Sequence, residues 1–352
     1  MGKLFNATAL VAVLMFISAC GGGGSTTTST STSTPTPTTL FSQTYTASAT
    51  AGELMTYTID TSALTYSYTI TKSSYGCEVV TAACHAGSGT LIKNTDGTYS
   101  PTTSPTAKIY ALKNGLLVGS VKLALNGIVQ NVPILGVANP ATALGDLAGT
   151  FNYMSLQCTS KSYGVYTGCA TFHGTVTVAS NGSFTSCTNG NIAAATPACQ
   201  NQTSGVLTSL GDGIFKLQAT APAIGSQTNY MVAFTAPNGQ KVGFIDFNDS
   251  VVYGYGQTIV SSSVDSVTAD IIGDYAYSND YGGAGKVTIN PNSTTSTGLA
   301  ITQNTPWKGI ATVTGGGAGT GYGIIAGNGV YVYRNPTIPS QSAYFEIGLK
   351  IN

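Results

Sequence analysis

The sequence GTVTVASNGSF at residues 174–184 carries the pattern from which the fold class follows. Apolar and polar side chains alternate in its first half, and a turn-forming Asn-Gly pair comes next, as in a strand that runs into a hairpin. The segments GTLIKNTDGTY at 89–99 and GKVTINPNSTT at 285–295 have the same plan. No window shows the sustained apolar spacing of a helix, apart from a short turn expected near residues 140–148. The sequence therefore predicts an all-β fold of antiparallel strands.

Three diverged copies of one plan follow one another along the chain. Each opens with an alternating aromatic pair, continues with one of the three segments above, and then has an Asn-Gly pair whose two residues suit the positive φ of a type I′ turn. The aromatic pairs are Tyr66-Ser67-Tyr68, Phe151-Asn152-Tyr153 and Tyr275-Ala276-Tyr277, and the Asn-Gly pairs lie at 114–115, 238–239 and 328–329. We expect repeats at 42–140, 145–256 and 267–352, each a meander, a small barrel or a sandwich sheet, with the last two either separate or combined in one domain.

Composition sets the limits on size and partners. The chain has 352 residues, more than one ordinary core accommodates, since cores stop growing near ~250 to 300 residues. Only 7% of the residues are charged, and Lys plus Arg equals Asp plus Glu at 13 each. No long-range field is available to attract a polyanion, so the composition argues against a nucleic-acid partner.

The first twenty residues, MGKLFNATALVAVLMFISAC, have the layout of an export signal. Lys3 supplies the positive start, residues 9–17 an apolar stretch too short to span a bilayer, and Ser18-Ala19 the small residues before a cysteine. The ending Ile17-Ser18-Ala19-Cys20 resembles the lipobox of bacterial lipoproteins. That resemblance implies a signal peptide at 1–19 and a lipidated mature N-terminus at Cys20. An ordinary secretory signal with a chance cysteine is the alternative.

The residue after Cys20 is Gly21, which in Gram-negative lipoproteins implies sorting to the outer membrane. Residues 21–39, GGGGSTTTSTSTSTPTPTT, contain no charge and no apolar side chain for a core, so 20–41 reads as a flexible tether with a span of roughly 25 Å. We therefore expect a protein of the cell envelope, anchored by its lipid on the periplasmic or the surface face. The folded part resembles no family that we identify.

Six further cysteines fall into neighbouring pairs. These are Cys77 with Cys84, Cys158 with Cys169, and Cys187 with Cys199. An even count suits an oxidising compartment, and hairpin arms already hold sequence neighbours close together. We predict three local disulfides in preference to a metal site, because no CxxC motif is present and His85 and His173 are the chain's only histidines.

Several side chains are candidates for binding. Tyr253, Tyr255, Tyr331 and Tyr333 form Tyr-x-Tyr pairs that place two rings on one strand face, where they would stack on a sugar. The pairs that open the repeats are interpreted as architectural instead. A run of aspartates offers a less favoured Ca²⁺ site, since Asp is also common in turns. Its members are Asp246, Asp249, Asp270, Asp274 and Asp280.

Convergent catalytic groups are scarce. No nucleophile motif surrounds either histidine, and Asp246 with Asp274 is the best available carboxylate pair for hydrolysis of a glycoside. We therefore predict a non-enzymatic binding or structural module without a cofactor, whose partner is a glycan, a protein or a small apolar ligand. A lipocalin-like carrier of a small apolar ligand is the first alternative, and a glycan-acting hydrolase is the second.

Overall fold

The computed structural model describes most of the chain from Leu40 onward, and residues from Leu40 to Asn352 form one compact unit. The described residues are 40–73, 86–111, 115–125, 128–158, 169–192, 199, 201–221, 225–235, 239–247, 255–262, 273–279, 284–289, 300–314, 320–325, 329–335 and 344–350. The fold is all-β, as predicted, and within these residues one 3₁₀ turn, η1 (Leu144–Leu147), is the only helical element. It lies where the short turn was expected. No described helix has the length and apolar character needed to cross a bilayer.

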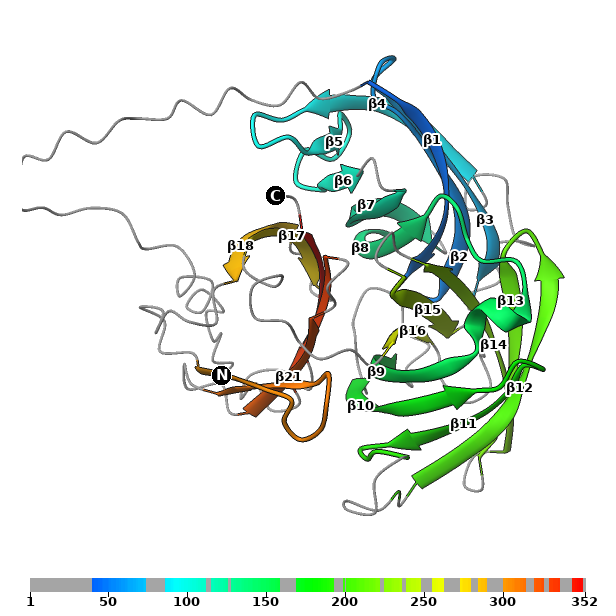
Figure 1. Ribbon diagram of the computed structural model, residues 1–352. Coiled ribbons are helices and arrows are strands. Elements are labelled where there is room, and N and C mark those ends of the chain that lie inside the picture. Colours follow the sequence, from blue (N-terminus) through cyan, green and yellow to red (C-terminus); the bar gives the residue numbers. More distant parts are fainter. Residues whose placement is uncertain are drawn as a thin grey trace, which may run out of the picture. The chain divides into compact units, whose positions relative to one another are not determined.

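The first sheet is a closed eight-stranded barrel in which each strand pairs antiparallel with the next and β8 pairs back with β1. Alternate residues point inward and fill it with apolar side chains such as Tyr45, Tyr57 and Ile134. Its strands, blue to cyan in Figure 1, are β1 (Ser42–Ala49), β2 (Glu53–Asp60), β3 (Thr65–Ser73), β4 (Ala86–Lys93), β5 (Tyr99–Pro101), β6 (Ile109–Ala111), β7 (Leu116–Leu125) and β8 (Ile128–Val137).

The second sheet is also a closed antiparallel barrel of eight strands, closed by pairing of β16 with β9. Phe151, Tyr153 and Phe215 lie in its apolar interior. The strands, green to olive in Figure 1, are β9 (Gly149–Cys158), β10 (Cys169–Val178), β11 (Ser183–Thr188), β12 (Asn201–Gly211), β13 (Ile214–Ala221), β14 (Gly225–Thr235), β15 (Lys241–Phe247) and β16 (Tyr255–Ser262). β16 continues past residue 256, where we expected the second repeat to end.

The third sheet has seven described strands in the order β18-β17-β23-β22-β21-β20-β19. Its first strand pairs with its second and with its last, as in the barrels, but β18 and β19 are not paired with each other. The strands are β17 (Gly273–Asn279), β18 (Ala284–Ile289), β19 (Ala300–Gln303), β20 (Ala311–Thr314), β21 (Thr320–Ile325), β22 (Val330–Asn335) and β23 (Tyr344–Lys350). The third sheet is therefore an open version of the same meander.

The three sheets share one strand order, but the aromatic pair assigned to the first repeat does not lie in the first strand. Phe151–Tyr153 and Tyr275–Tyr277 lie in the first strands of their sheets, whereas Tyr66 and Tyr68 lie in the third strand of the first barrel. The reason is that these rings pack over glycines of the next strand in each sheet, so the pattern reports this packing and not the strand number. Whether the repeats fold as separate domains stays a prediction.

The glycines of the three Asn-Gly pairs occupy equivalent places before the second-last strand of each sheet. Gly115, Gly239 and Gly329 have φ of 81°, 80° and 89°, the conformation expected in a type I′ turn. Their asparagines lie outside the described residues. This third feature of the repeat therefore occurs at the same strand position in all three sheets.

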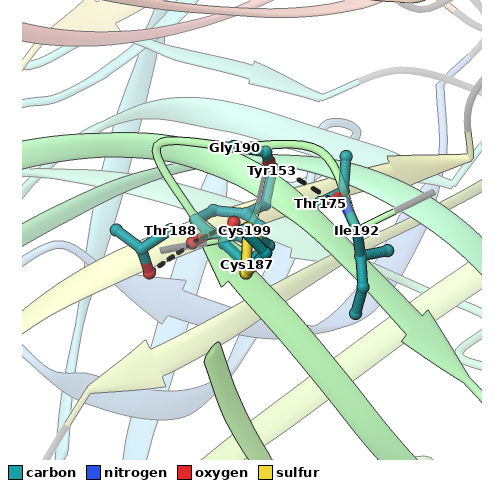
Figure 2. The surroundings of a disulfide bond; sticks show 7 residues. All are labelled: Tyr153, Thr175, Cys187, Thr188, Gly190, Ile192 and Cys199. Atoms are coloured by element: carbon teal, nitrogen blue, oxygen red, sulfur yellow. Dashed lines mark hydrogen bonds between the residues drawn. A yellow bond between two sulfur atoms is a disulfide. The ribbon is translucent and has the colours of Figure 1, made fainter. Parts of the chain in front are cut away.

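Two of the predicted disulfides are present. Cys158 and Cys169 are directly opposite on β9 and β10, with a Cα–Cα distance of 3.9 Å, and Cys187 bonds to Cys199 across the β11–β12 connection. Figure 2 shows the second bridge beside Tyr153. Cys77 and Cys84 lie outside the described residues. Disulfides fit an extracytoplasmic protein, because reducing compartments keep thiols free.

Candidate binding face on the third sheet

Strand alternation divides the third sheet into two chemically different faces. On β22, Val330, Val332 and Arg334 point to one side, where the two valines join an apolar core that includes residues of both barrels. Tyr331 and Tyr333 point to the other side. The same division holds on β17 and β23, so one face of the sheet gathers Tyr275, Tyr277, Asn279, Tyr331, Tyr333, Tyr344 and Glu346.

Glu346 is at the centre of this group. Its carboxylate accepts hydrogen bonds from the hydroxyls of Tyr331 and Tyr344. In the register of the sheet, Glu346 is opposite Tyr333 on one neighbouring strand and opposite Asn279 on the other. Three strands therefore present their polar and aromatic side chains around one carboxylate.

Amides and ring contacts hold the surrounding tyrosines in place. Asn279 Nδ2 donates to the Tyr344 hydroxyl (3.3 Å), and Asn335 Nδ2 donates to the Tyr333 hydroxyl (3.3 Å). The rings of Tyr333 and Tyr344 have centroids 5.9 Å apart and planes inclined at 60°. Ring planes tilted in this way form two walls of a corner and not a flat stack.

The group has a buried base and a part-exposed rim. Tyr331 is 4% exposed and meets Tyr275, which is fully buried, edge to face at 5.2 Å. The residues Tyr277, Asn279, Tyr333, Tyr344 and Glu346 are only partly buried. We call Tyr277, Asn279, Tyr331, Tyr333, Tyr344 and Glu346 together the tyrosine face.

Glu346 is the one carboxyl group among the six residues of the tyrosine face. Burial raises the pKa of Glu346, and the hydrogen bonds from Tyr331 and Tyr344 oppose that rise. Burial, followed by the charge of Glu346, raises the pKa of Tyr277. The only ion pair among the described residues joins Lys108 to Asp96 (2.6 Å), so no described cation lies at ion-pair distance from Glu346.

The predicted tyrosine candidates have different outcomes. Tyr333 belongs to the accessible rim of the tyrosine face, whereas Tyr331 is too buried to contact a ligand and serves instead as a hydrogen-bond donor to Glu346. Tyr255 begins β16, and Tyr253 lies outside the described residues. Of the predicted pair, Tyr333 therefore lies at the rim, and Tyr331 holds Glu346 in place from below.

Asp246 is placed where a substrate or an ion does not reach it. It is fully buried, and its carboxyl accepts a hydrogen bond from Ser48 of the first barrel (2.7 Å). Burial raises its pKa to about 8, so the group is mainly protonated at neutral pH. Asp274, its proposed catalytic partner, accepts instead from Thr288 Oγ1 (2.6 Å) at the surface of the third sheet. This geometry provides no accessible acid–base pair.

Most of the remaining metal candidates lie where the structure does not describe the chain. Asp249, Asp270 and Asp280 lie outside the described residues, and within the described part of the chain no three His, Cys, Asp or Glu side chains gather at metal-binding distance. Of the histidines, His85 also lies outside that part, and His173 is buried in β10.

His173 belongs to a polar cluster that joins the second barrel to the third sheet. Arg334, the chain's single arginine, donates to the Thr171 carbonyl oxygen (2.6 Å) and to His173 Nδ1 (2.5 Å). The imidazole stacks on Tyr322 (4.3 Å) and on Trp307 (5.3 Å). Burial, followed by the Arg334 charge, lowers the pKa of His173 to about 3, so it is the neutral acceptor that the guanidinium needs. These contacts give the cluster a structural role.

Both barrel interiors are occupied by the protein's own side chains. The first is filled by large residues with almost no exposed surface, and the second has an equivalent cluster around Phe215. A cavity beside Leu147 and Met231 in the second barrel is too small to hold a water molecule. This packing counts against a lipocalin-like carrier, which needs an open lumen.

Sequence reasoning missed three residues of the tyrosine face, Asn279, Tyr344 and Glu346, and interpreted Tyr277 as architectural. A signal was present. Glu346 is one of only three glutamates in the chain, and it alternates with Tyr344 within an apolar strand. A charged residue at a strand position that shares a face with aromatics is uncommon enough to mark a site.

Comparison with known proteins assigns no family. No protein-family model and no curated protein matches the chain. A protein of unknown function from the DUF3598 family of Nostoc punctiforme matches with a TM-score of 0.24 and 11% identity, over 64% of this chain and 95% of that one. A single mutant of the vaccine antigen transferrin binding protein B from Haemophilus parasuis matches with a TM-score of 0.25 and 10% identity, over 60% and 63%. A double mutant of the same antigen matches with a TM-score of 0.23 and 8% identity, over 85% of this chain and 65% of that one. This chain therefore spans less than two thirds of that antigen.

Proposed function

We propose that the chain is a lipid-anchored binding protein of the bacterial cell envelope, most consistent with the outer membrane, whose ligand surface is the tyrosine face of the third sheet. Cys20 carries the lipid, residues 21–39 form the tether, and the disulfide-braced sheets carry the binding surface. The binding is non-enzymatic.

One observation carries the choice of surface. Four tyrosines from three strands lie around the carboxylate of Glu346, and three of these residues are only partly buried. The opposite face of the same strands carries apolar residues, whereas this face adds a carboxylate and two amides to its rings. A part-exposed cluster of aromatic and hydrogen-bonding groups is the usual chemistry of a recognition surface.

The two other function classes have less support. A carrier would hold its ligand inside a barrel, where aromatic and aliphatic side chains already fill the space. A glycan hydrolase would use Asp246, whose carboxyl has no exposed surface. The tyrosine face remains the arrangement that is both accessible and chemically specific.

The anchor is tested by labelling cells with a radioactive or clickable fatty acid. We expect label to enter the wild-type chain and not a Cys20→Ser variant, and we expect the variant to leave the membrane fraction. If the variant partitions with membranes at the same processed mass, the lipid anchor is wrong.

The binding surface is tested with the full-length protein in non-ionic detergent and defined soluble probes: neutral sugars, amino acids, choline and short peptides. We expect at least one probe class to bind, and a Tyr333→Leu, Tyr344→Leu double variant to lose that binding by tenfold or more. An Asp274→Asn variant, altered on the other face of β17, is the matched control and should retain it. If the double variant binds every probe as well as wild type does, this surface is wrong.

A further inference from the structure

We propose that the tyrosine face recognises a cationic group, an alkylammonium or quaternary ammonium, held between the rings of Tyr333 and Tyr344 and against the carboxylate of Glu346. This inference rests on the proposed function and specifies its ligand class.

The first argument is charge. Both carboxylate oxygens of Glu346 accept tyrosine hydroxyl protons, which fix the group in position without neutralising it. No described cation pairs with it. The lysine that follows on the same strand face, Lys350, is four residues further along β23, or roughly 13 Å at strand spacing. A carboxylate that is partly withdrawn from water is stabilised most by a positive ligand.

The second argument is the shape of the rim. Tyr333 and Tyr344 present ring planes inclined at 60° with centroids 5.9 Å apart, and Glu346 is opposite Tyr333 in the register of the sheet. Cations are attracted to ring faces within about 6 Å of the centroid, with about 0.5 to 2 kcal/mol per ring. Two tilted tyrosine rings beside one carboxylate form a corner that suits an ammonium group.

Other ligand classes fit less well. Ca²⁺ takes about six to eight oxygen ligands, and the tyrosine face offers one carboxylate. An anion is repelled by Glu346. A neutral sugar can stack on the rings, but it gives no compensation for the carboxylate charge. The negative charge of Glu346 therefore favours an organic cation over an anion or a neutral sugar.

The test is isothermal titration of the full-length protein in non-ionic detergent with choline, with its neutral isostere 3,3-dimethylbutan-1-ol, and with N-acetylglucosamine. We expect choline to bind at least tenfold tighter than the alcohol. Affinity for choline should increase as pH rises through the Glu346 pKa, because the raised pKa leaves part of the population protonated at lower pH. Tyr277, Tyr331, Tyr333 and Tyr344, whose pKa values are all raised, stay neutral in that range.

Two variants separate the contributions. Glu346→Gln should lower choline affinity at least tenfold and remove its pH dependence. Tyr333→Phe should retain affinity while Tyr333→Leu loses it about fivefold, since the ring and not the hydroxyl faces the cation. Asp274→Asn is the control and should behave as wild type.

The outcomes distinguish the two levels of the proposal. Equal binding of choline and the neutral alcohol, or tight binding of N-acetylglucosamine alone, overturns the cation inference and leaves the binding function standing. Failure of choline together with failure of every probe class in the wider panel overturns both. Because the comparison of choline with its isostere uses wild-type protein, a variant that fails to fold does not leave the question open.

Discussion

The ring of Tyr153 in β9 covers Gly174 in β10, and a Cβ atom added to Gly174 would come within 2.8 Å of the ring and 1.9 Å of the Cys187 carbonyl oxygen. The Tyr153 hydroxyl then donates to that carbonyl (3.3 Å) and shares a hydrogen bond with Thr188 Oγ1 (2.8 Å), as Figure 2 shows. Glycine leaves the space into which the ring folds, and the ring replaces the packing that glycine lacks.

This relationship predicts that Gly174→Ala destabilises the protein by about 3 kcal/mol, at the upper end of the range for overpacking, because backbone and not a flexible side chain blocks the new methyl group. Gly145→Ala is the control, since nothing lies within 4 Å of its Cβ position. Urea unfolding monitored by circular dichroism should show a lower midpoint for the first variant and an unchanged midpoint for the second. Equal midpoints for both variants would contradict the packing role.

The same pairing explains how much of the fold the sequence could predict. Strand and turn patterns were sufficient for the all-β class and the disulfide pairs at 158–169 and 187–199. They misplaced the first copy, because Tyr66 and Tyr68 pack over Gly89 and Gly87 as Tyr153 packs over Gly174. Packing of a ring over a glycine can occur between any two neighbouring strands of a meander. It therefore does not show which position a strand has in its sheet.

The candidate site was predictable only in part. Alternation in the sequence shows which residues share a face of a strand, but it does not show how deeply each one is buried. Tyr331 and Tyr333 share a face, yet Tyr331 is buried and Tyr333 is only partly buried. Glu346 was missed because its neighbours come from β17 and β22, which are distant in sequence. Asp246 was a candidate for metal binding and for acid–base chemistry, but it is buried and its hydrogen-bond donor Ser48 precedes it by 198 residues.

The disulfides give the next prediction. Serine replacement of Cys158 with Cys169, or of Cys187 with Cys199, should each lower the free energy of unfolding by about 2 to 4 kcal/mol, because the two bridges span similar sequence separations of 11 and 12 residues. Denaturant midpoints of both double variants provide the measurement, with reductant added to the wild type for comparison. If reduction leaves the wild-type midpoint unchanged, these bridges do not stabilise the fold.

Neutral His173 predicts an acid-sensitive contact between the second barrel and the third sheet. Its pKa is about 3 in the folded protein and 6.5 in the unfolded chain, so the unfolded state binds the extra proton between these values. Stability from this group is therefore complete above about pH 6.5 and is lost as pH falls toward 3. His173→Asn keeps an acceptor for Arg334 without a titrating ring, and it should reduce the loss of stability in a pH series from 7 to 3. If the variant loses as much stability between pH 7 and pH 3 as the wild type does, that result would argue against a neutral, buried His173.

Asp246 predicts a pH dependence of the opposite sign. Its pKa rises from 3.8 to about 8 on folding, so between these values the folded state holds a proton that the unfolded state has released. Stability from this group therefore falls as pH rises through the window, by at most about 1.4 kcal/mol per pH unit, and levels off above about pH 8. Asp246→Asn retains the acceptor for Ser48 and cannot ionise.

Unfolding free energies of this variant should accordingly lack the decline between pH 5 and pH 8, and near pH 8 the variant should be more stable than wild type. Ser48→Ala is the matched control, because it removes the hydrogen-bond donor but leaves the carboxyl, and its decline should persist. His173→Asn acts at a different contact. It should leave this decline in place while it reduces the loss of stability at acid pH. If Asp246→Asn follows the wild-type curve throughout, the carboxyl is ionised in the folded protein, and a buried, protonated Asp246 between the two barrels is wrong.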